Sequence, residues 1–140
     1  MGPSRAGHRW GVPGDALEPA ADQLSVPSLP ASIASVRRFA VQACHAGAFA
    51  PSLCDTLALL VSEVATNALV HGTGDVQVRV TTRERVLRVE VADDSPQMPQ
   101  PRSAGLLEEG GRGLSLVDQL AQGWGVYREG AGKVVWFELA

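Results

Sequence analysis

The stretch SEVATNALVHG at residues 62–72 combines the apolar spacing of a core helix with two polar residues one turn apart. Glu63 and Asn67 are four positions apart, so their side chains lie on one helix face, and His71 continues the row. At ~100° per residue that row lies beside the apolar stripe and not opposite it. A partly buried carboxylate and carboxamide need polar partners, which a ligand or the neighbouring backbone can supply. Taken alone, this pattern favours the neighbouring backbone, and not a bound ligand, as the source of those polar partners.

The sequence around this stretch predicts two helices. Apolar residues recur at helical spacing from Ala31 to about Ala46, which is typical of an amphipathic helix. Pro51 begins a second helix, and Gly72 and Gly74 end it. The expected core stripes are Ile33, Val36, Ala40 and Cys44 in the first helix, and Leu53, Leu57, Leu60, Val61, Val64 and Ala68 in the second.

Alternating apolar residues predict the strands. VQVRV at 76–80 and VLRVEVAD at 86–93 have the period of strands, with a turn between them over 81–85. A short edge strand is predicted at 23–27, a short helix from Gly113 to about Ala121, and closing strands near 124–128 and 133–139. This order favours an α/β two-layer sandwich, in which a mixed sheet carries helices on one face.

Length and composition predict a single domain. The chain has 140 residues, 45% of them hydrophobic, which suffices for one core. Residues 1–22 are rich in Gly and Pro and read as a flexible tail, which leaves 23–140 as the domain. A net charge of -3 does not favour nucleic acid as a partner. Neither a signal peptide nor an apolar run of membrane-spanning length is expected, so a cytoplasmic location follows.

The two cysteines, Cys44 and Cys54, do not match a zinc spacing with the nearby histidines. We expect them to be buried thiols in a reducing compartment.

Asp93 occupies a core-facing position at the end of its predicted strand, because the alternation of Val89 and Val91 continues to it. Buried aspartates are rare unless they are paired or hydrogen-bonded. An exocyclic amino group of a base is a suitable donor. The alternative is a strand-end turn aspartate, which is common and which the neighbouring Asp94 fits better.

The stretch GGRGLSLV at 110–117 places glycines directly before a predicted helix start. Exposed amide groups there, together with the helix dipole, form an anion site. Gly111 and Gly113 allow the backbone to approach a phosphate closely. The alternative is a glycine-rich helix entry without a ligand. The preceding segment, 95–112, is a long loop of the kind that is usually functional or disordered.

These three features occur in a fixed order: Glu-x-x-x-Asn on a helix, an aspartate at a strand end, and Gly-x-Gly at a helix start. That order resembles the GHKL ATPase superfamily of gyrase B subunits, MutL repair proteins and sensor histidine kinases. Within it, the chain looks most like the anti-sigma-factor serine/threonine kinases over about residues 24–140. The resemblance implies the Bergerat ATP-binding fold.

The resemblance also implies roles for individual residues. Glu63 matches the general base, Asn67 the ligand that holds Mg²⁺, and Asp93 the carboxylate that accepts a hydrogen bond from the adenine amino group. Residues 95–112 match the ATP lid. The implied nucleotide contacts are Asn67, His71, Asp93, Gly111, Arg112, Gly113 and Leu114.

Two functions follow as expectations. The first is a kinase that uses Mg·ATP to phosphorylate a small antagonist protein and thereby regulates a sigma factor; a homodimer is also common among such proteins. The second is a regulatory module that acts by protein contact with little or no catalysis. The second is favoured by Ser95 and Gln97, where the family often has Gly-x-Gly, and by Val134 after Gly132-Lys133, where a supporting threonine is often found. The catalytic half of a sensor histidine kinase is disfavoured, because no long dimerising helix pair with a phosphoacceptor histidine is visible.

Overall fold

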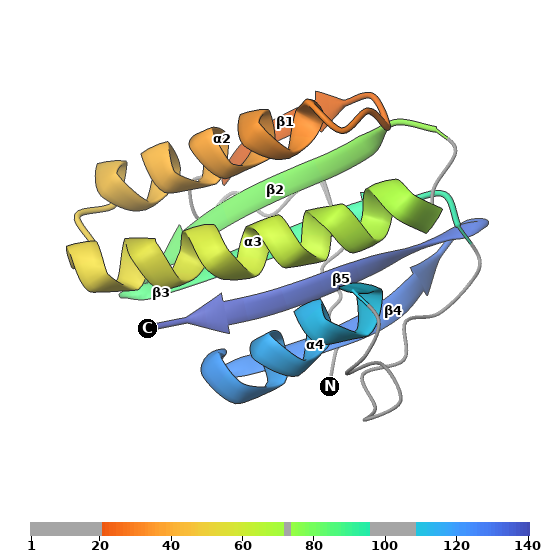
Figure 1. Cartoon of the computed structure of the whole chain (residues 1–140). Helices are drawn as coiled ribbons and strands as arrows, with labels where there is room; N and C mark the ends of the chain where they lie inside the picture. The colour runs from red at the N-terminus through yellow and green to blue at the C-terminus, as the bar shows by residue number, and fades with distance from the viewer. Residues whose placement is uncertain (1–20, 72–73, 96–108) are drawn as a thin grey trace.

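The computed structural model describes residues 21–71, 74–95 and 109–140, with only the backbone described at His71 and at 109–113. One five-stranded sheet, in the order β1-β2-β3-β5-β4, is covered on one face by three helices (Figure 1). The predicted α/β two-layer sandwich with helices on one face is confirmed. The elements are β1 (Ala21–Val26), α2 (Ser32–Ala46), α3 (Pro51–His71), β2 (Val76–Arg83), β3 (Val86–Asp93), α4 (Glu109–Leu120), β4 (Gly123–Glu129) and β5 (Gly132–Leu139).

The predicted mixed sheet is wrong, because every neighbouring pair of strands is antiparallel. Two helices, α2 and α3, connect β1 to β2 and return the chain to the end at which β1 finished, so β2 runs back along β1. The single helix α4 does make β3 and β4 parallel, as a helical crossover should. However, β5 lies between these two strands and pairs antiparallel with both.

Most element bounds agree with the sequence prediction. Both long helices are confirmed, and β1 lies at the sheet edge as expected, although it begins two residues earlier, at Ala21. Strand β2 continues to Arg83 because the turn needs only two residues, Glu84 and Arg85, both with positive φ. Residues 1–20 of the predicted tail and 96–108 of the predicted lid lie outside the described residues.

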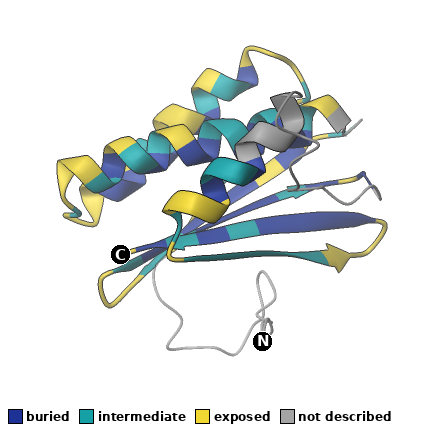
Figure 2. Cartoon of the chain, turned by 60° about the horizontal axis from the view of Figure 1, so that its bottom comes forward, coloured by how far each residue is buried: buried dark blue, intermediate teal, exposed yellow. Residues whose placement is uncertain are grey.

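The core lies between α3 and the middle of the sheet. Leu57, Leu60, Val61 and Val64 of α3 are at most 1% exposed, and the inward-facing valines of β2 and β3 are equally buried. In Figure 2 the buried colour follows the helix faces that look toward the sheet. Helix α3 thus combines a core stripe with the polar pair that the sequence predicts beside it.

The expectation that no apolar run reaches membrane-spanning length is wrong for α3. Residues 51–70 have the length and mean hydropathy, 1.5, of a membrane span. The reason is that α3 is the central helix of the domain and contacts α2, α4 and the sheet. A buried core helix passes the same test of length and composition, so this helix is weak evidence for a membrane.

The cysteines are paired in the structure, so the prediction of free thiols is wrong. A disulfide joins Cys44 of α2 to Cys54 of α3, with the Cα atoms 5.8 Å apart. Both residues are buried, as predicted. The spacing of ten residues does not reveal the pair; the antiparallel packing of α2 and α3 brings the two side chains together.

Candidate functional site

Asp93 is buried at the end of β3 and forms an ion pair with a lysine of the neighbouring strand. Lys133 lies directly opposite it in the β3–β5 register. The Lys133 Nζ atom donates to Asp93 Oδ1 over 2.9 Å, and the two side chains are only 5% and 1% exposed. The backbone N–H of Ser95 donates to the same oxygen over 2.8 Å. Asp93 therefore has the partners that a buried carboxylate requires.

The second carboxylate oxygen of Asp93 has a different environment. Asp93 Oδ2 is buried and has no hydrogen-bond partner within the described part of the chain. An unpartnered buried acceptor is costly, so native proteins retain few of them without a function. A ligand N–H would satisfy this atom. The predicted buried, core-facing position of Asp93 is confirmed, and its bond from the Ser95 N–H is also that of a strand-end turn aspartate, so both predicted features are present.

Strands β3 and β5 approach unusually closely beside Asp93. A Cβ atom built on Gly132 would collide with the carbonyl oxygen of Asp93 and lie 2.8 Å from the Cα of Asp94. Only glycine fits here, because any side chain would overlap backbone atoms. This contact places Lys133, the next residue, within reach of Asp93.

The predicted polar pair of α3 lies at the edge of the core. Asn67 is buried, at 9% exposure, and Glu63 is half-buried. Among the described residues, none makes a hydrogen bond to the Asn67 side chain. The third member of the row, His71, lies at the end of α3, where the side chain is not described. The roles assigned to these three residues remain predictions.

The strand register brings the carboxyl end of α3 to the end of β3 that carries Asp93. Strand β2 follows α3 closely, and Gln77 near its start lies opposite Ala92 of β3. In the connection between α3 and β2, a Cβ atom on Gly74 would lie 2.9 Å from Oδ2 of Asp94. Gly74 therefore lies against Asp94, the residue next to Asp93.

The amino end of α4 also points toward this end of the sheet. Strand β4 begins opposite Glu138 and ends opposite Gly132, beside the Asp93–Lys133 pair. Because α4 precedes β4 directly, α4 ends at the far side of the sheet and begins on the Asp93 side. Figure 1 shows the carboxyl ends of α3 and β3 and the start of α4 toward the same side of the molecule.

Helix α4 begins at Glu109, so the predicted start at Gly113 is wrong. Each glycine lowers helix propensity by about 1 kcal/mol, which led to the late prediction. Packing outweighs this cost, since Leu114 and Val117 are buried in the core. In an α-helix only the first four N–H groups lack an internal partner. The N–H groups of residues 109–111 are therefore the ones available to an anion, whereas the Gly113 and Leu114 amides lie further along the helix.

The residues at 110–113 are described by their backbone alone, so the contact predicted for the Arg112 side chain lies outside the description. The Leu114 side chain is 1% exposed and belongs to the core. Within the described residues, no three His, Cys, Asp or Glu side chains cluster as a metal site. A Mg²⁺ ion at Asn67 would therefore need further oxygens from a ligand or from water.

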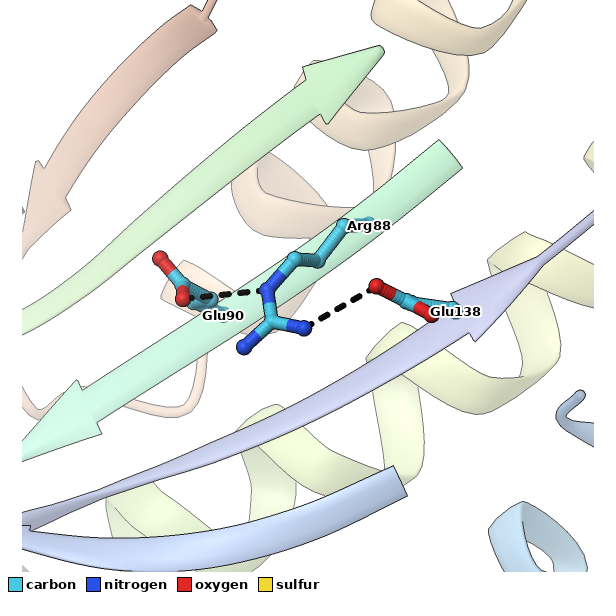
Figure 3. A network of polar contacts seen from close by, with 3 residues as sticks. All are labelled: Arg88, Glu90 and Glu138. Atoms are coloured by element: carbon cyan, nitrogen blue, oxygen red, sulfur yellow. Dashed lines mark hydrogen bonds and ion pairs between the residues drawn. The ribbon is translucent and has the colours of Figure 1, made fainter. Parts of the chain in front are cut away.

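A second polar cluster lies on the sheet face away from the helices (Figure 3). Arg88 donates to Glu90 over 3.2 Å and to Glu138 over 3.0 Å, and its guanidinium carbon lies 4.1 Å from the Trp136 ring centre. Burial raises the pKa of Glu90 above its ordinary value, and the Arg88 charge partly opposes that shift. A Cβ atom on Gly125 would lie 2.8 Å from the indole nitrogen, so the indole lies across β4.

A groove of about 700 Å³ lies at the opposite end of the sheet and is not the predicted site. Its walls include Phe49 just before α3, Leu53 in the first turn of α3, Arg85 in the β2–β3 turn, and Leu139 at the end of β5. None of the predicted nucleotide-contact residues lines it.

Sequence reasoning missed Lys133 as a site residue. The sequence shows only that Val134, after Gly132-Lys133, stands where a supporting threonine is often found, and it does not single out the lysine. Its position opposite Asp93 depends on the register between β3 and β5, which are separated by α4 and β4 along the chain. The apolar alternation of residues 133–139 does place the lysine on the inward face, and that was the available signal.

Solved structures with the same fold include histidine kinase domains. The chain is similar to the blue-light-activated histidine kinase of Erythrobacter litoralis EL346, at 33% identity over 63% of this chain and 30% of that chain, with a TM-score of 0.51. A structure of that kinase domain is 27% identical over 81% of this chain and 60% of the other, also with a TM-score of 0.51. The SiaB–SiaC complex structure from Pseudomonas aeruginosa shares the fold at 13% identity, covering 84% and 87% of the two chains with a TM-score of 0.58.

Sequence comparison finds a relative and a family. The uncharacterized protein SCO4941 of Streptomyces coelicolor is 44% identical over 55 residues, which are 38% of this chain and 52% of that protein. The chain therefore aligns with about half the length of this relative. The family description "histidine kinase-like ATPase domain" matches residues 26–139 of the 140. This chain belongs to the histidine kinase-like ATPase domain family.

Proposed function

We propose that this protein is an ATP-dependent serine/threonine kinase of the anti-sigma-factor type. It phosphorylates a small antagonist protein and thereby regulates a sigma factor. The observation that carries the nucleotide site is the buried, unpartnered Asp93 Oδ2 atom, at the end of the sheet where the polar edge of α3 and the start of α4 converge. That atom matches the chemistry of an adenine amino group, which offers an N–H.

We assign each residue of the proposed site a separate role in phosphoryl transfer. Asn67, together with water and phosphate oxygens, holds Mg²⁺, and the amide groups at the start of α4 receive phosphate oxygens. Bound Mg·ATP supplies the phosphoryl group and neutralises the developing charge. Glu63 would act as the base that accepts the proton of the attacking serine hydroxyl as the new phosphate ester forms and ADP leaves. His71, Arg112, Gly111, Gly113 and Leu114 complete the proposed nucleotide contacts.

Protein partners follow from this assignment. The proposed substrate is the antagonist protein, the regulated protein is the sigma factor, and a second copy of the chain is a further partner. The fold neighbour from Pseudomonas aeruginosa is itself a complex of two proteins, SiaB with SiaC, which supports protein recognition by this fold. The proposed location is the cytoplasm, where ATP is available.

A regulatory module with little or no catalysis is the second candidate. Val134 favours it, because the threonine hydroxyl often found there is absent, and Lys133 engages the Asp93 carboxylate instead. The two candidates share nucleotide binding and differ in phosphoryl transfer, so one series of variants separates them.

The first measurement is the affinity for ATP with and without Mg²⁺, by calorimetry. We expect Asn67→Ala to weaken Mg·ATP binding at least about tenfold, because a metal ligand is lost. The variant should keep its fold, since Asn67 lies at the edge of the core. Unchanged affinity with a folded variant would remove Asn67 from the site.

The second measurement is phosphoryl transfer to small proteins encoded beside this one. Glu63→Ala should bind Mg·ATP like the wild type but transfer phosphate about 10²–10⁴-fold more slowly, the usual contribution of a general base. Transfer that is absent in the wild type, with ATP still bound, favours the regulatory module.

A further inference from the structure

Lys133 donates a hydrogen bond to one of the two oxygens of Asp93, the carboxylate of the proposed base pocket. Asp93 Oδ1 accepts from Lys133 Nζ at 2.9 Å and from the Ser95 N–H at 2.8 Å. Oδ2 accepts from nothing in the described chain. The two oxygens of this carboxylate therefore differ. Oδ1 accepts two hydrogen bonds, whereas the buried Oδ2 accepts none from the described residues.

The number of carboxylate oxygens available to accept a hydrogen bond decides which base the carboxylate selects. Two adjacent acceptors match the N1–H and N2–H donors of guanine, much as they match the paired donors of arginine. A single acceptor matches the one outward N–H of the adenine amino group. Guanine carries an acceptor, O6, where adenine carries that amino group, so it repels a lone carboxylate oxygen.

We propose that Lys133 is a specificity-determining residue of the base pocket, which selects adenine by engaging Asp93 Oδ1 and leaving Oδ2 alone to read the base. The inference rests on the proposed nucleotide site and adds the residue that sets its selectivity. Lys133 acts through Asp93 and does not itself contact the base.

The geometry of the sheet makes this arrangement rigid. Lys133 and Asp93 are direct cross-strand partners, and the close contact at Gly132 holds the two backbones together. The lysine side chain is 5% exposed, so water competes little for its ammonium group. The ammonium also balances the charge of the buried carboxylate.

The test compares the affinities of wild type and Lys133→Met for Mg·ATP, Mg·GTP and Mg·ITP by calorimetry. These three nucleotides share the triphosphate, so a general loss of binding cancels in the ratios. We expect the wild type to prefer ATP over GTP by about tenfold or more. In Lys133→Met, Oδ1 keeps only the Ser95 N–H and can accept a second donor, so the preference should fall to within about threefold, with GTP gaining more than ITP because ITP lacks the 2-amino group.

Several outcomes would overturn the inference. An unchanged ATP:GTP ratio in Lys133→Met contradicts it while leaving the nucleotide site intact, and an equal gain for ITP and GTP contradicts the paired-oxygen account. Should Lys133→Met fail to fold, Lys133→Gln retains a shorter, neutral donor, and its ratio should fall by about threefold; no fall overturns the inference. A wild type that binds no nucleotide instead refutes the proposed function itself.

Discussion

Gly132 shows how a single missing side chain shapes the site. A Cβ atom there would overlap the backbone of Asp93, whereas the space beside Gly123 is open enough for ordinary contact, with the nearest atom at 3.9 Å. The absence of a side chain at residue 132 lets β5 approach β3 and carries Lys133 to its partner. The most local feature of the sequence, one glycine, thus positions the ion pair.

We expect Gly132→Ala to lower the free energy of unfolding by about 1–3 kcal/mol, because the added methyl group forces two backbones apart. Nucleotide affinity should fall as well, since Asp93 moves with its strand. Urea unfolding measures the first effect and calorimetry the second. Gly123→Ala is the matched control and should change the stability by less than about 0.5 kcal/mol. Equal effects of the two substitutions would contradict the proposed close contact.

Glu90 links stability to pH. Burial raises its pKa above the ordinary value of 4.5, with Arg88 and Arg79 opposing the shift. The folded state therefore holds a proton that the unfolded state has already lost, and the Glu90 contribution to stability falls as the pH rises from about 4.5 through the raised pKa. Glu90→Gln removes this titration.

The wild type should therefore lose stability relative to Glu90→Gln as the pH is raised across that window. Urea unfolding of both proteins between about pH 4 and pH 7 measures the difference. A stability difference that does not change with pH would show that Glu90 has the same proton affinity in both states.

At the scale of elements, α3 has two functions on adjoining faces. Its apolar stripe packs against α2, α4 and the sheet, and its polar row places Glu63 and Asn67 at the stripe's edge. One helix therefore both holds the core together and carries the predicted catalytic pair. Damage to the stripe should affect stability first, and damage to the row should affect ligand binding first.

Two adjacent leucines of α3 separate these faces. Leu60 is fully buried and Leu59 is 42% exposed. We expect Leu60→Ala to cost about 2–5 kcal/mol of stability by leaving a cavity. Leu59→Ala, the same substitution one position earlier, should stay within about 1 kcal/mol. Denaturant unfolding distinguishes them, and a similar cost for both would contradict the assigned orientation of α3.

At the scale of the molecule, the proposed site is assembled at one end of the sheet from elements distant in sequence. The carboxyl ends of α3 and β3 and the start of α4 all point there, as the strand register requires. The groove beside the β2–β3 turn occupies the other end. A ligand at the first end would contact both layers and stabilise the whole domain.

Mg·ATP should therefore raise the unfolding temperature of the intact protein. At a free concentration of about 100 times Kd, the expected gain is about 2.7 kcal/mol, because only the folded state binds. Differential scanning calorimetry measures the shift. Asn67→Ala, if its affinity is about tenfold weaker, should gain only about half as much at the same nucleotide concentration. A shift of equal size in that variant would contradict the assigned role of Asn67.

The amino-acid sequence by itself determined the helices α2 and α3, the presence of five strands and the inward position of Asp93. These features follow from local periodicity, which each segment carries in its own residues. The family resemblance rests on the order of three such local features, and family membership is confirmed. The catalytic and ligand roles of Glu63 and Asn67 remain predictions.

Only the tertiary structure decided the antiparallel sheet, the early start of α4, the Cys44–Cys54 disulfide and the Asp93–Lys133 pair. Each depends on contacts between segments far apart in the chain or on packing that overrides local propensity. The physical reason is that sequence periodicity determines which face of a helix or strand is buried. Strand register and helix packing determine which residues of other elements that face contacts.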